Sequence, residues 1–82
     1  MLRFISDPGH GWLEVPMGTI RYLGIEHKIS GFSYRKGDMA YLEEDCDAPT
    51  FIDAYRNRYG ARPRFYEEFE ENTPIRSYPS YC

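Results

Sequence analysis

The sequence lacks the residue patterns that build most metal and catalytic centres. Its two cysteines and two histidines show none of the C-x2-C, H-x3-H or H-E-x-x-H spacings that bring two metal ligands to one face. Neither glycine-rich phosphate-binding pattern, G-x-x-x-x-G-K-S/T or G-x-G-x-x-G, is present. We therefore expect no metal, no cofactor and no catalytic residues, and the protein is not expected to be an enzyme.

Long apolar runs and cysteine pairs are also scarce, and this bears on where the protein works. Cys46 and Cys82 are too few for a disulfide framework, which favours a reduced compartment. The N-terminal apolar stretch is broken by Ser6-Asp7-Pro8, so no signal peptide is indicated. No apolar run approaches the roughly 18 residues of a membrane helix. These features predict a cytoplasmic protein with no membrane partner.

Basic residues are outnumbered, and this argues against a general nucleic-acid-binding domain. The net charge is −3, from 13 acidic and 10 basic residues, whereas such domains normally carry a basic excess. The acids lie in blocks: residues 37–47 hold five acids and no base, and residues 66–82 hold four glutamates and one arginine. Such blocks are usually solvated, but they also steer a partner of opposite charge.

The clearest structural signal that is present predicts a helix over residues 48–59. Asp47 is able to cap its free backbone N–H groups, Pro49 falls in its first turn, and Gly60 is placed to end it. Four side chains recur at helical spacing and predict the buried face: Phe51, Ile52, Tyr55 and Tyr59. A short helix is predicted near residues 17–23, with Gly24 closing it.

An antiparallel sheet of about three strands is predicted beside the main helix. One strand runs from Trp12 to Val15, and residues 32–43 form a hairpin around a glycine-containing turn. A lone hairpin is marginal in water, so this sheet must pack against the 48–59 helix. The predicted fold class is α+β, a single small domain with its core in residues 1–60 and a partly extended Tyr- and Glu-rich tail in residues 61–82.

The predicted core collects the apolar residues of these elements: Leu13, Val15, Ile20, Leu23, Ile25, Ile29, Phe32, Tyr34, Leu42, Phe51, Ile52 and Tyr55. The tail is ambiguous. A further short helix starting at Pro63 is one alternative, although its glutamates would crowd the C-terminal half, where the helix dipole disfavours them. An extended conformation, wrapped on the domain or ordering on a partner, is the other.

Two functional hypotheses follow from single groups of residues. Cys46 stands at a helix start, where a thiolate gains from the positive helix end, but Asp45 and Asp47 flank it and raise its pKa. A small thiol-dependent enzyme or redox regulator using Cys46 and one histidine is thus an alternative function. Another is nucleic-acid binding by the face from Arg56 to Arg64, where arginines and tyrosines interleave.

Three stretches resemble short uncharacterised proteins of bacteriophages and integrative elements: Pro8-Gly9-His10-Gly11-Trp12-Leu13, then Leu23-Gly24-Ile25 with Lys28-Ile29-Ser30-Gly31-Phe32-Ser33-Tyr34, then Ala40-Tyr41-Leu42-Glu43-Glu44-Asp45-Cys46-Asp47-Ala48. The resemblance covers about residues 6–56 and brings no catalytic residues. It implies a viral context in which small acidic proteins bind and block a host machine. Inhibitors of bacterial defence complexes, including anti-CRISPR proteins, belong to that class.

These features favour a non-enzymatic binding protein, a phage-type inhibitor that binds a host defence complex and occludes its nucleic-acid-binding surface. Clustered carboxylates can approach the charge spacing of a phosphate backbone and occupy a basic groove, and tyrosine rings suit a contact surface. The expected contact residues are Glu43, Glu44, Asp45, Asp47, Glu67, Glu68, Glu70, Glu71 and Tyr78. The expected partner is a protein complex that handles nucleic acid in the host cytoplasm, without direct binding of nucleic acid by this chain.

Overall fold

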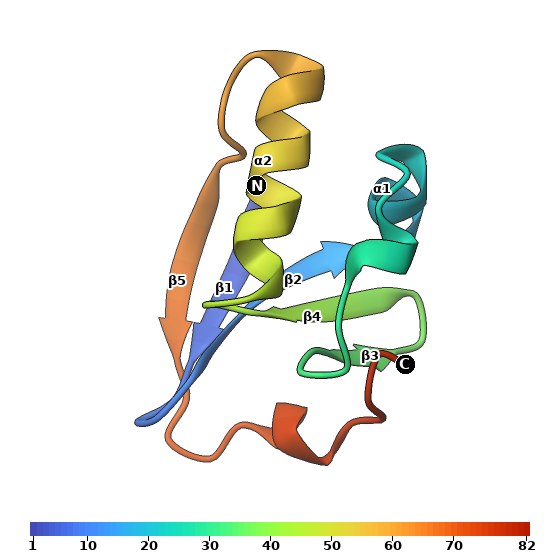
Figure 1. Cartoon of the computed structure of the whole chain (residues 1–82). Helices are drawn as coiled ribbons and strands as arrows, with labels where there is room; N and C mark the ends of the chain where they lie inside the picture. Colours follow the sequence, from blue (N-terminus) through green and yellow to red (C-terminus); the bar gives the residue numbers. More distant parts are fainter.

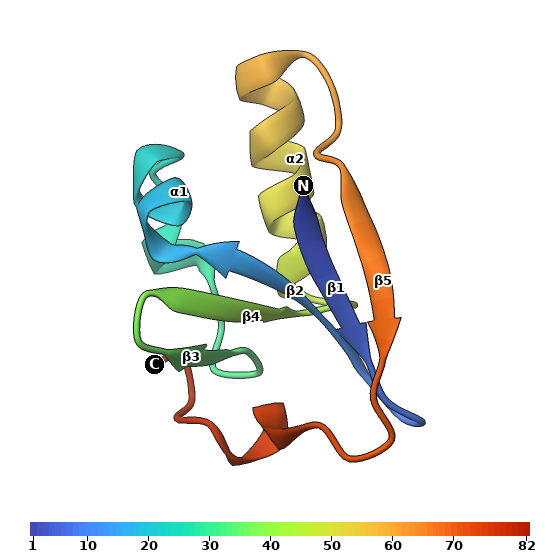
Figure 2. The same cartoon turned by 180° about the vertical axis from the view of Figure 1, so that it is seen from behind.

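A computed structural model describes the whole chain, residues 1–82. It contains a five-stranded mixed sheet with two α-helices on one face (Figures 1 and 2). In chain order the elements are β1 (Leu2–Ser6), β2 (Gly11–Pro16), α1 (Met17–Tyr22), the 3₁₀ helix η1 (Glu26–Lys28), β3 (Tyr34–Lys36), β4 (Met39–Glu43), α2 (Asp47–Tyr59), β5 (Phe65–Phe69) and the 3₁₀ helix η2 (Pro74–Ser77). The strand order is β3-β4-β2-β1-β5, and only β1 and β5 run parallel.

The α+β class is confirmed, but the prediction of about three antiparallel strands is wrong. β1 and β5 are additional strands, and β5 lies where a helix starting at Pro63 was one of the alternatives. The two strands pair along their length: Leu2 N donates to Arg64 O at 3.0 Å, and Glu70 N donates to Ser6 O at 2.8 Å. A pairing between the two ends of the chain leaves no periodic signal in a local window, so the sequence pattern does not reveal it.

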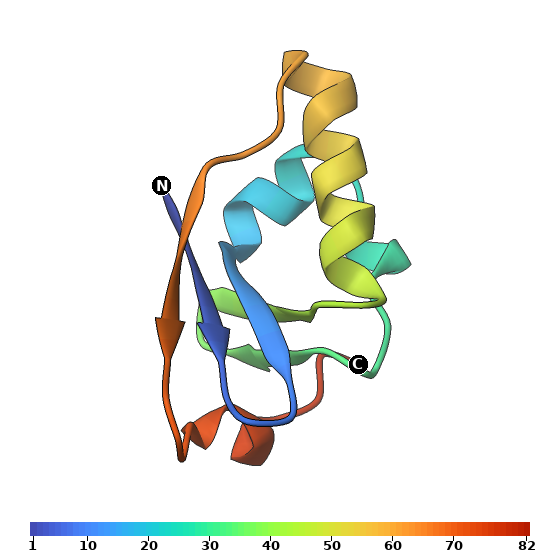
Figure 3. The ribbon, with the colours of Figure 1, turned by 90° about the vertical axis from the view of Figure 1, so that its left-hand side faces the viewer.

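Figure 3 shows α1 and α2 together on one side of the sheet. Apolar side chains are buried on both faces of the sheet. The face toward α1 and α2 carries the larger core: Leu13, Val15, Met17, Ile20, Ile25, Ile29, Ala40, Leu42, Ala48 and Phe51. The opposite face carries a second cluster formed by Ile5, Trp12, Tyr41 and Ile75. Because Ile75 comes from η2, the C-terminal segment supplies the layer that covers this second face.

The C-terminal segment also covers one edge of the sheet. Arg35 N donates to Pro79 O, and Tyr81 N donates to Ser33 O, each at 2.9 Å. Tyr34 and Ser80 form an isolated antiparallel bridge. Residues 61–82 therefore add a strand, a buried side chain and an edge cover to the fold. Neither α-helix is both long and apolar enough to cross a membrane.

The predicted core is partly wrong at the loop before β3. Phe32 is 71% exposed, whereas Ser33 is fully buried. The Ser33 hydroxyl donates to the Asp47 carboxyl group, and this inward bond turns the neighbouring Phe32 toward solvent. Four other predicted core residues are half-buried: Leu23, Tyr34, Ile52 and Tyr55. The remaining seven are buried: Leu13, Val15, Ile20, Ile25, Ile29, Leu42 and Phe51.

The end of α2 is as predicted, whereas the role predicted for Asp47 is wrong. Gly60 ends the helix in the left-handed conformation, with φ of 75°. Asp47 is 3% exposed and caps no helix N–H group. Its side chain instead accepts from Ser30 N at 3.1 Å, from Ser30 Oγ at 2.7 Å and from Ser33 Oγ. A tertiary set of donors thus replaces the local capping role.

We expect Asp47→Ala to lower the free energy of unfolding by about 2–4 kcal/mol, because three donors lose their acceptor in a buried place. Asp45→Ala is the matched control. Asp45 is exposed, and its truncation should change the free energy of unfolding by less than about 0.5 kcal/mol. Urea denaturation of both variants measures the difference, and equal small losses would contradict the structural role of Asp47.

Candidate functional site

The sheet topology brings the two acidic blocks of the sequence to the same end of the sheet. Glu44 follows β4, and its N–H donates to Gly11 O at 3.1 Å. Glu70 follows β5, and its N–H donates to Ser6 O at 2.8 Å. Ser6 and Gly11 are themselves partners across β1 and β2. Three strand spacings, roughly 15 Å, therefore separate the two blocks.

We call this region the acidic end and define it by Glu43, Glu44, Asp45, Glu70 and Glu71. Four of these side chains are exposed and Glu43 is half-buried. None of the five lies within ion-pair distance of a cationic group, because the three salt bridges join Arg3 to Glu14, Arg3 to Glu68 and Arg76 to Asp7. The acidic end thus carries negative charge that the fold does not neutralise.

The other predicted contact residues lie elsewhere. Asp47 is buried, so it cannot contact a partner, and that prediction is wrong. Glu67 accepts from Ser6 Oγ at 3.0 Å, and Glu68 accepts from Arg3 Nη1 at 3.2 Å, both on β5. Tyr78 is half-buried and packs on Tyr41, with ring centroids 5.2 Å apart. Tyr78 therefore packs against the second core cluster.

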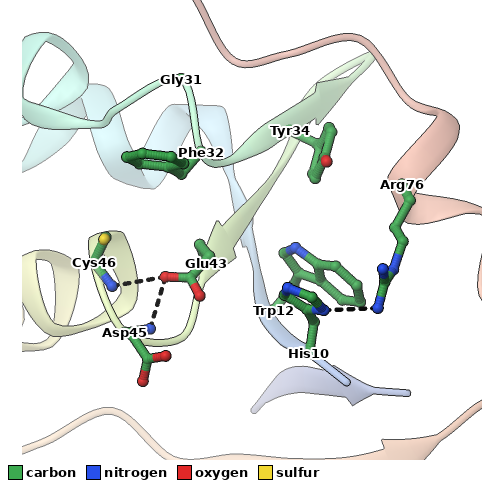
Figure 4. A pocket seen from close by; sticks show the side chains of 9 residues that line it. All are labelled: His10, Trp12, Gly31, Phe32, Tyr34, Glu43, Asp45, Cys46 and Arg76. Atoms are coloured by element: carbon green, nitrogen blue, oxygen red, sulfur yellow. Dashed lines mark hydrogen bonds between the residues drawn. The ribbon is translucent and has the colours of Figure 1, made fainter. Parts of the chain in front are cut away.

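A pocket of about 380 Å³ opens beside the acidic end (Figure 4). Four parts of the chain line it: the start of β2, the loop before β3, the connection from β4 to α2, and η2. The lining residues are His10, Trp12, Gly31, Phe32, Tyr34, Glu43, Asp45, Cys46 and Arg76. Glu43 and Asp45 belong to both the acidic end and the pocket, so the two form one continuous surface.

The floor of the pocket is a fixed aromatic group centred on Trp12. Trp12 is only 2% exposed. His10 stacks on it with ring centroids 5.9 Å apart and an interplanar angle of 15°, and Tyr34 meets it edge-on at 6.4 Å. The Arg76 guanidinium lies 5.8 Å from the Trp12 ring, which is within the range of a cation–π contact. Packing from several sides holds these rings in place.

The positive charge of Arg76 is neutralised within the fold. Arg76 donates to both oxygens of Asp7, at 3.0 and 3.1 Å, and its Nη2 lies 2.7 Å from Nδ1 of His10. The bond from Arg76 is the largest cause that lowers the pKa of Asp7 to about 2, and the N–H groups of Gly9 and His10 add to it. The carboxylates of Glu43 and Asp45 are therefore the uncompensated charges of the pocket.

The acidic wall is held by the turn that leads into α2. Glu43 Oε1 accepts from Asp45 N and from Cys46 N, each at 2.8 Å. These bonds fix the Glu43 side chain at the pocket, which the exposed side chain of Phe32 also lines (Figure 4). Carboxylates and an aromatic ring in one pocket form an environment that an arginine guanidinium favours. The pocket is thus chemically suited to a guanidinium or ammonium group.

Cys46 is exposed on the pocket wall. Partial desolvation is the largest cause that raises the pKa of its thiol, and the charges of Glu43, Asp47 and Asp45 raise it further. A raised pKa keeps the sulfur protonated near neutral pH, which is unfavourable for a nucleophile. No group of three or more His, Cys, Asp or Glu side chains is arranged to hold a metal ion.

The arginine face has a partly structural role. Arg58 Nη2 donates to Tyr22 OH at 2.5 Å, and its guanidinium lies 5.3 Å from the rings of Tyr22 and Tyr59. Arg58 thus links α2 to α1. Arg62 and Arg64 line a second pocket, of about 500 Å³, together with Tyr55 and Tyr59.

The pocket residues Trp12, His10 and Arg76 were not predicted as site residues. His10 and Trp12 are two residues apart, a spacing that puts both side chains on one face of an extended chain. That spacing is a weak signal that a histidine can stack on the tryptophan. Arg76 has no comparable signal, because its partners lie 66 and 69 residues away in the sequence.

We expect Arg76→Gln to raise the pKa of Asp7 from about 2 toward its ordinary value of 3.8. Because the folded-state pKa is lowered, Asp7 contributes stability above about pH 4, and this contribution is lost as the pH falls toward 2. A pH titration of the Asp7 carboxyl carbon by NMR measures the shift. Arg62→Gln removes an exposed arginine that makes no contact with Asp7 and should leave the titration unchanged. An unchanged midpoint in Arg76→Gln would contradict this account.

No protein-family model, no curated protein and no solved structure matches this chain.

Proposed function

We propose that this chain is a non-enzymatic binding protein that docks its acidic end on a basic, nucleic-acid-binding surface of a protein partner. The observation that carries the proposal is the convergence of two acidic blocks, far apart in the sequence, at one end of the sheet. The carboxylates there have no internal cationic partner. A partner that supplies cations gains both association rate and specificity from such a surface.

The pocket supports the same proposal at atomic detail. Its free charges are the carboxylates of Glu43 and Asp45, since Asp7 offsets Arg76. The exposed ring of Phe32 lies on the same side as these carboxylates (Figure 4). An arginine of the partner would stack on Phe32 and pair with the acidic wall. Arginine is abundant on surfaces that bind phosphate backbones, because its planar fork matches phosphate geometry.

The biological setting follows from the resemblance to phage and integrative-element proteins. In that setting the partner is a host defence complex, and occupation of its nucleic-acid groove inhibits it in the manner of an anti-CRISPR protein. The acidic end has two anchoring regions about 15 Å apart. This span covers several phosphates of one strand of nucleic acid, so one molecule would cover a groove rather than a single subsite.

A thiol-dependent activity of Cys46 is the alternative function, and its chemistry has less support. The raised pKa of the Cys46 thiol opposes thiolate formation. Of the two histidines, His10 lies at the same pocket, where its Nδ1 already contacts Arg76. A base that activates a thiol needs a free ring nitrogen directed at the sulfur.

We expect reversal of the charges at Glu44, Asp45, Glu70 and Glu71 to weaken capture of the partner at least tenfold without unfolding the protein. Glu43 is left intact because it holds the turn before α2. The measurement is a tagged pull-down from nuclease-treated lysate of the source host, eluted in steps of salt and identified by mass spectrometry. A stoichiometric nucleic-acid-handling complex that elutes as salt rises is the expected result.

The matched control for this experiment reverses two exposed acids outside the acidic end, Asp38 and Asp53, and is compared with the Glu44 and Asp45 double reversal. Both variants change the net charge equally. Equal loss of binding in the two variants would indicate a general charge effect and would contradict docking through the acidic end. Capture that persists in the four-site variant would contradict it directly.

We expect the rate at which iodoacetamide alkylates Cys46 to rise with pH, with a midpoint above that of free cysteine. Desolvation and nearby carboxylates disfavour the thiolate. The Cys82→Ser variant leaves Cys46 as the only thiol, and the rate is measured against pH. Asp45→Asn removes one of these nearby charges and should lower the midpoint. Rapid labelling of Cys46 below pH 7 would instead favour the thiol-dependent alternative.

A further inference from the structure

One edge of the sheet is covered by another part of the chain, and the other edge is open. The edge at β3 is covered by the C-terminal segment through hydrogen bonds to Pro79 and Tyr81. The edge at β5 has no neighbour (Figure 2). All five residues of β5 are exposed. An uncovered edge strand presents unpaired N–H and C=O groups and is a template for pairing with another chain.

The register of β5 identifies which backbone groups are free. Arg64 O and Glu70 N bond to β1, and alternate residues of a strand turn their backbone groups to opposite sides. The even-numbered residues of β5 therefore turn their backbone N–H and C=O groups toward β1. Phe65, Glu67 and Phe69 turn their N–H and C=O groups to the open edge. These three residues offer the backbone pattern that an added strand requires.

The aromatic side chains of β5 do not protect this edge. Phe65, Tyr66 and Phe69 are 45%, 47% and 61% exposed. Apolar rings of this size are normally buried or covered in a monomer. Between them lie Glu67 and Glu68, exposed carboxylates on opposite faces of the strand. An occupant must therefore offer apolar contacts at both ends of the segment and positive charge at its centre.

A second copy of this chain does not meet that requirement. Antiparallel pairing of two β5 strands centred on Glu67 places the two Glu67 side chains opposite each other. The register centred on Glu68 instead places the two Glu68 side chains opposite each other. Like charges directly opposite each other destabilise a strand pair. The glutamates thus disfavour self-association and select a cationic strand.

We propose that β5 is a docking edge for a basic, extended segment of a protein partner, which adds antiparallel to β5 as a sixth strand. Read from its N-terminus, the segment places an apolar residue opposite Phe69, lysine or arginine opposite Glu68 and Glu67, and an apolar residue opposite Phe65. Opposite charges and aromatic pairs across strands both favour this register. The backbone supplies affinity and the two glutamates supply selectivity.

This inference deepens the proposed function, because it rests on a basic protein partner, but it concerns a different surface. β5 lies at the sheet edge, whereas the pocket lies between β2, β4 and η2. One partner can therefore contact the acidic end and the edge together. Each surface is tested with its own variants, so that failure of one leaves the other standing.

The test uses the whole protein and an acetylated, amidated peptide, Thr-Val-Lys-Lys-Thr-Val-Thr. NMR records amide shifts and hydrogen exchange during titration. At nine-tenths occupancy, exchange of the N–H groups of Phe65, Glu67 and Phe69 should slow by about tenfold, because only bound molecules are protected. A peptide with glutamates in place of the lysines should have no effect. Unchanged exchange at all three residues would overturn the proposal.

Two substitutions at one position isolate the backbone contribution. Glu67→Pro and Glu67→Gln remove the same charge, but only proline removes the outward N–H group. The N–H of residue 67 is not bonded to β1, so proline is tolerated there as on other edge strands. Both are compared in a Ser6→Ala background, because Ser6 Oγ donates to Glu67. We expect Glu67→Pro to bind the peptide about five- to tenfold more weakly than Glu67→Gln.

The outcomes separate the two proposals. Equal peptide affinity of the Glu67→Pro and Glu67→Gln variants would overturn strand addition. Partner capture that depends on Glu44 and Asp45 while the peptide fails to protect β5 would overturn the docking edge and leave the proposed function intact. Folding of the variants is checked by their amide spectra. If Glu67→Pro unfolds, protection of the three amide groups in the unaltered protein still decides the question.

Discussion

The structure depends on one buried acceptor, the carboxyl group of Asp47. It fastens the loop before β3 to the start of α2 through Ser30 and Ser33. Ser33 Oγ in turn accepts from Glu43 N at 2.9 Å, which ties the end of β4 to the same point. Two of the four parts of the chain that line the pocket, the loop before β3 and the connection from β4 to α2, are therefore held by one connected set of hydrogen bonds. No buried side-chain polar atom is left without a partner, as a polar network of this kind requires.

The second constraint comes from the size of the chain, because a small domain has little core to bury. The sheet is therefore covered on both faces, by α1 and α2 on one and by the C-terminal segment on the other. That segment also covers the β3 edge. Covering Trp12 with Ile75 and Arg76 builds the pocket, while the β5 edge stays open. The C-terminal segment therefore contributes both to the pocket and to the cover of the β3 edge.

What the sequence predicted correctly is local, and what it missed is not. Gly60 and the helical spacing of Phe51, Ile52, Tyr55 and Tyr59 are signals within one element, and they are sufficient to predict α2. Asp47 has strong local capping propensity, but the buried serine hydroxyls compete for it and win. The acidic blocks can be recognised from the composition of the sequence. Their convergence cannot be predicted from it, because it results from the pairing of β1 with β5 across almost the whole chain.

The distribution of ion pairs makes the acidic end more selective than a net charge of −3 suggests. Arg3 and Arg76 pair with Glu14, Glu68 and Asp7, and none of these three acids belongs to the acidic end. At physiological salt the Debye length is about 8 Å, shorter than the roughly 15 Å between the blocks. The blocks therefore act as two separate anchors rather than as one field. A partner must present cations at both points at contact distance, which favours an extended basic groove over a diffuse positive surface.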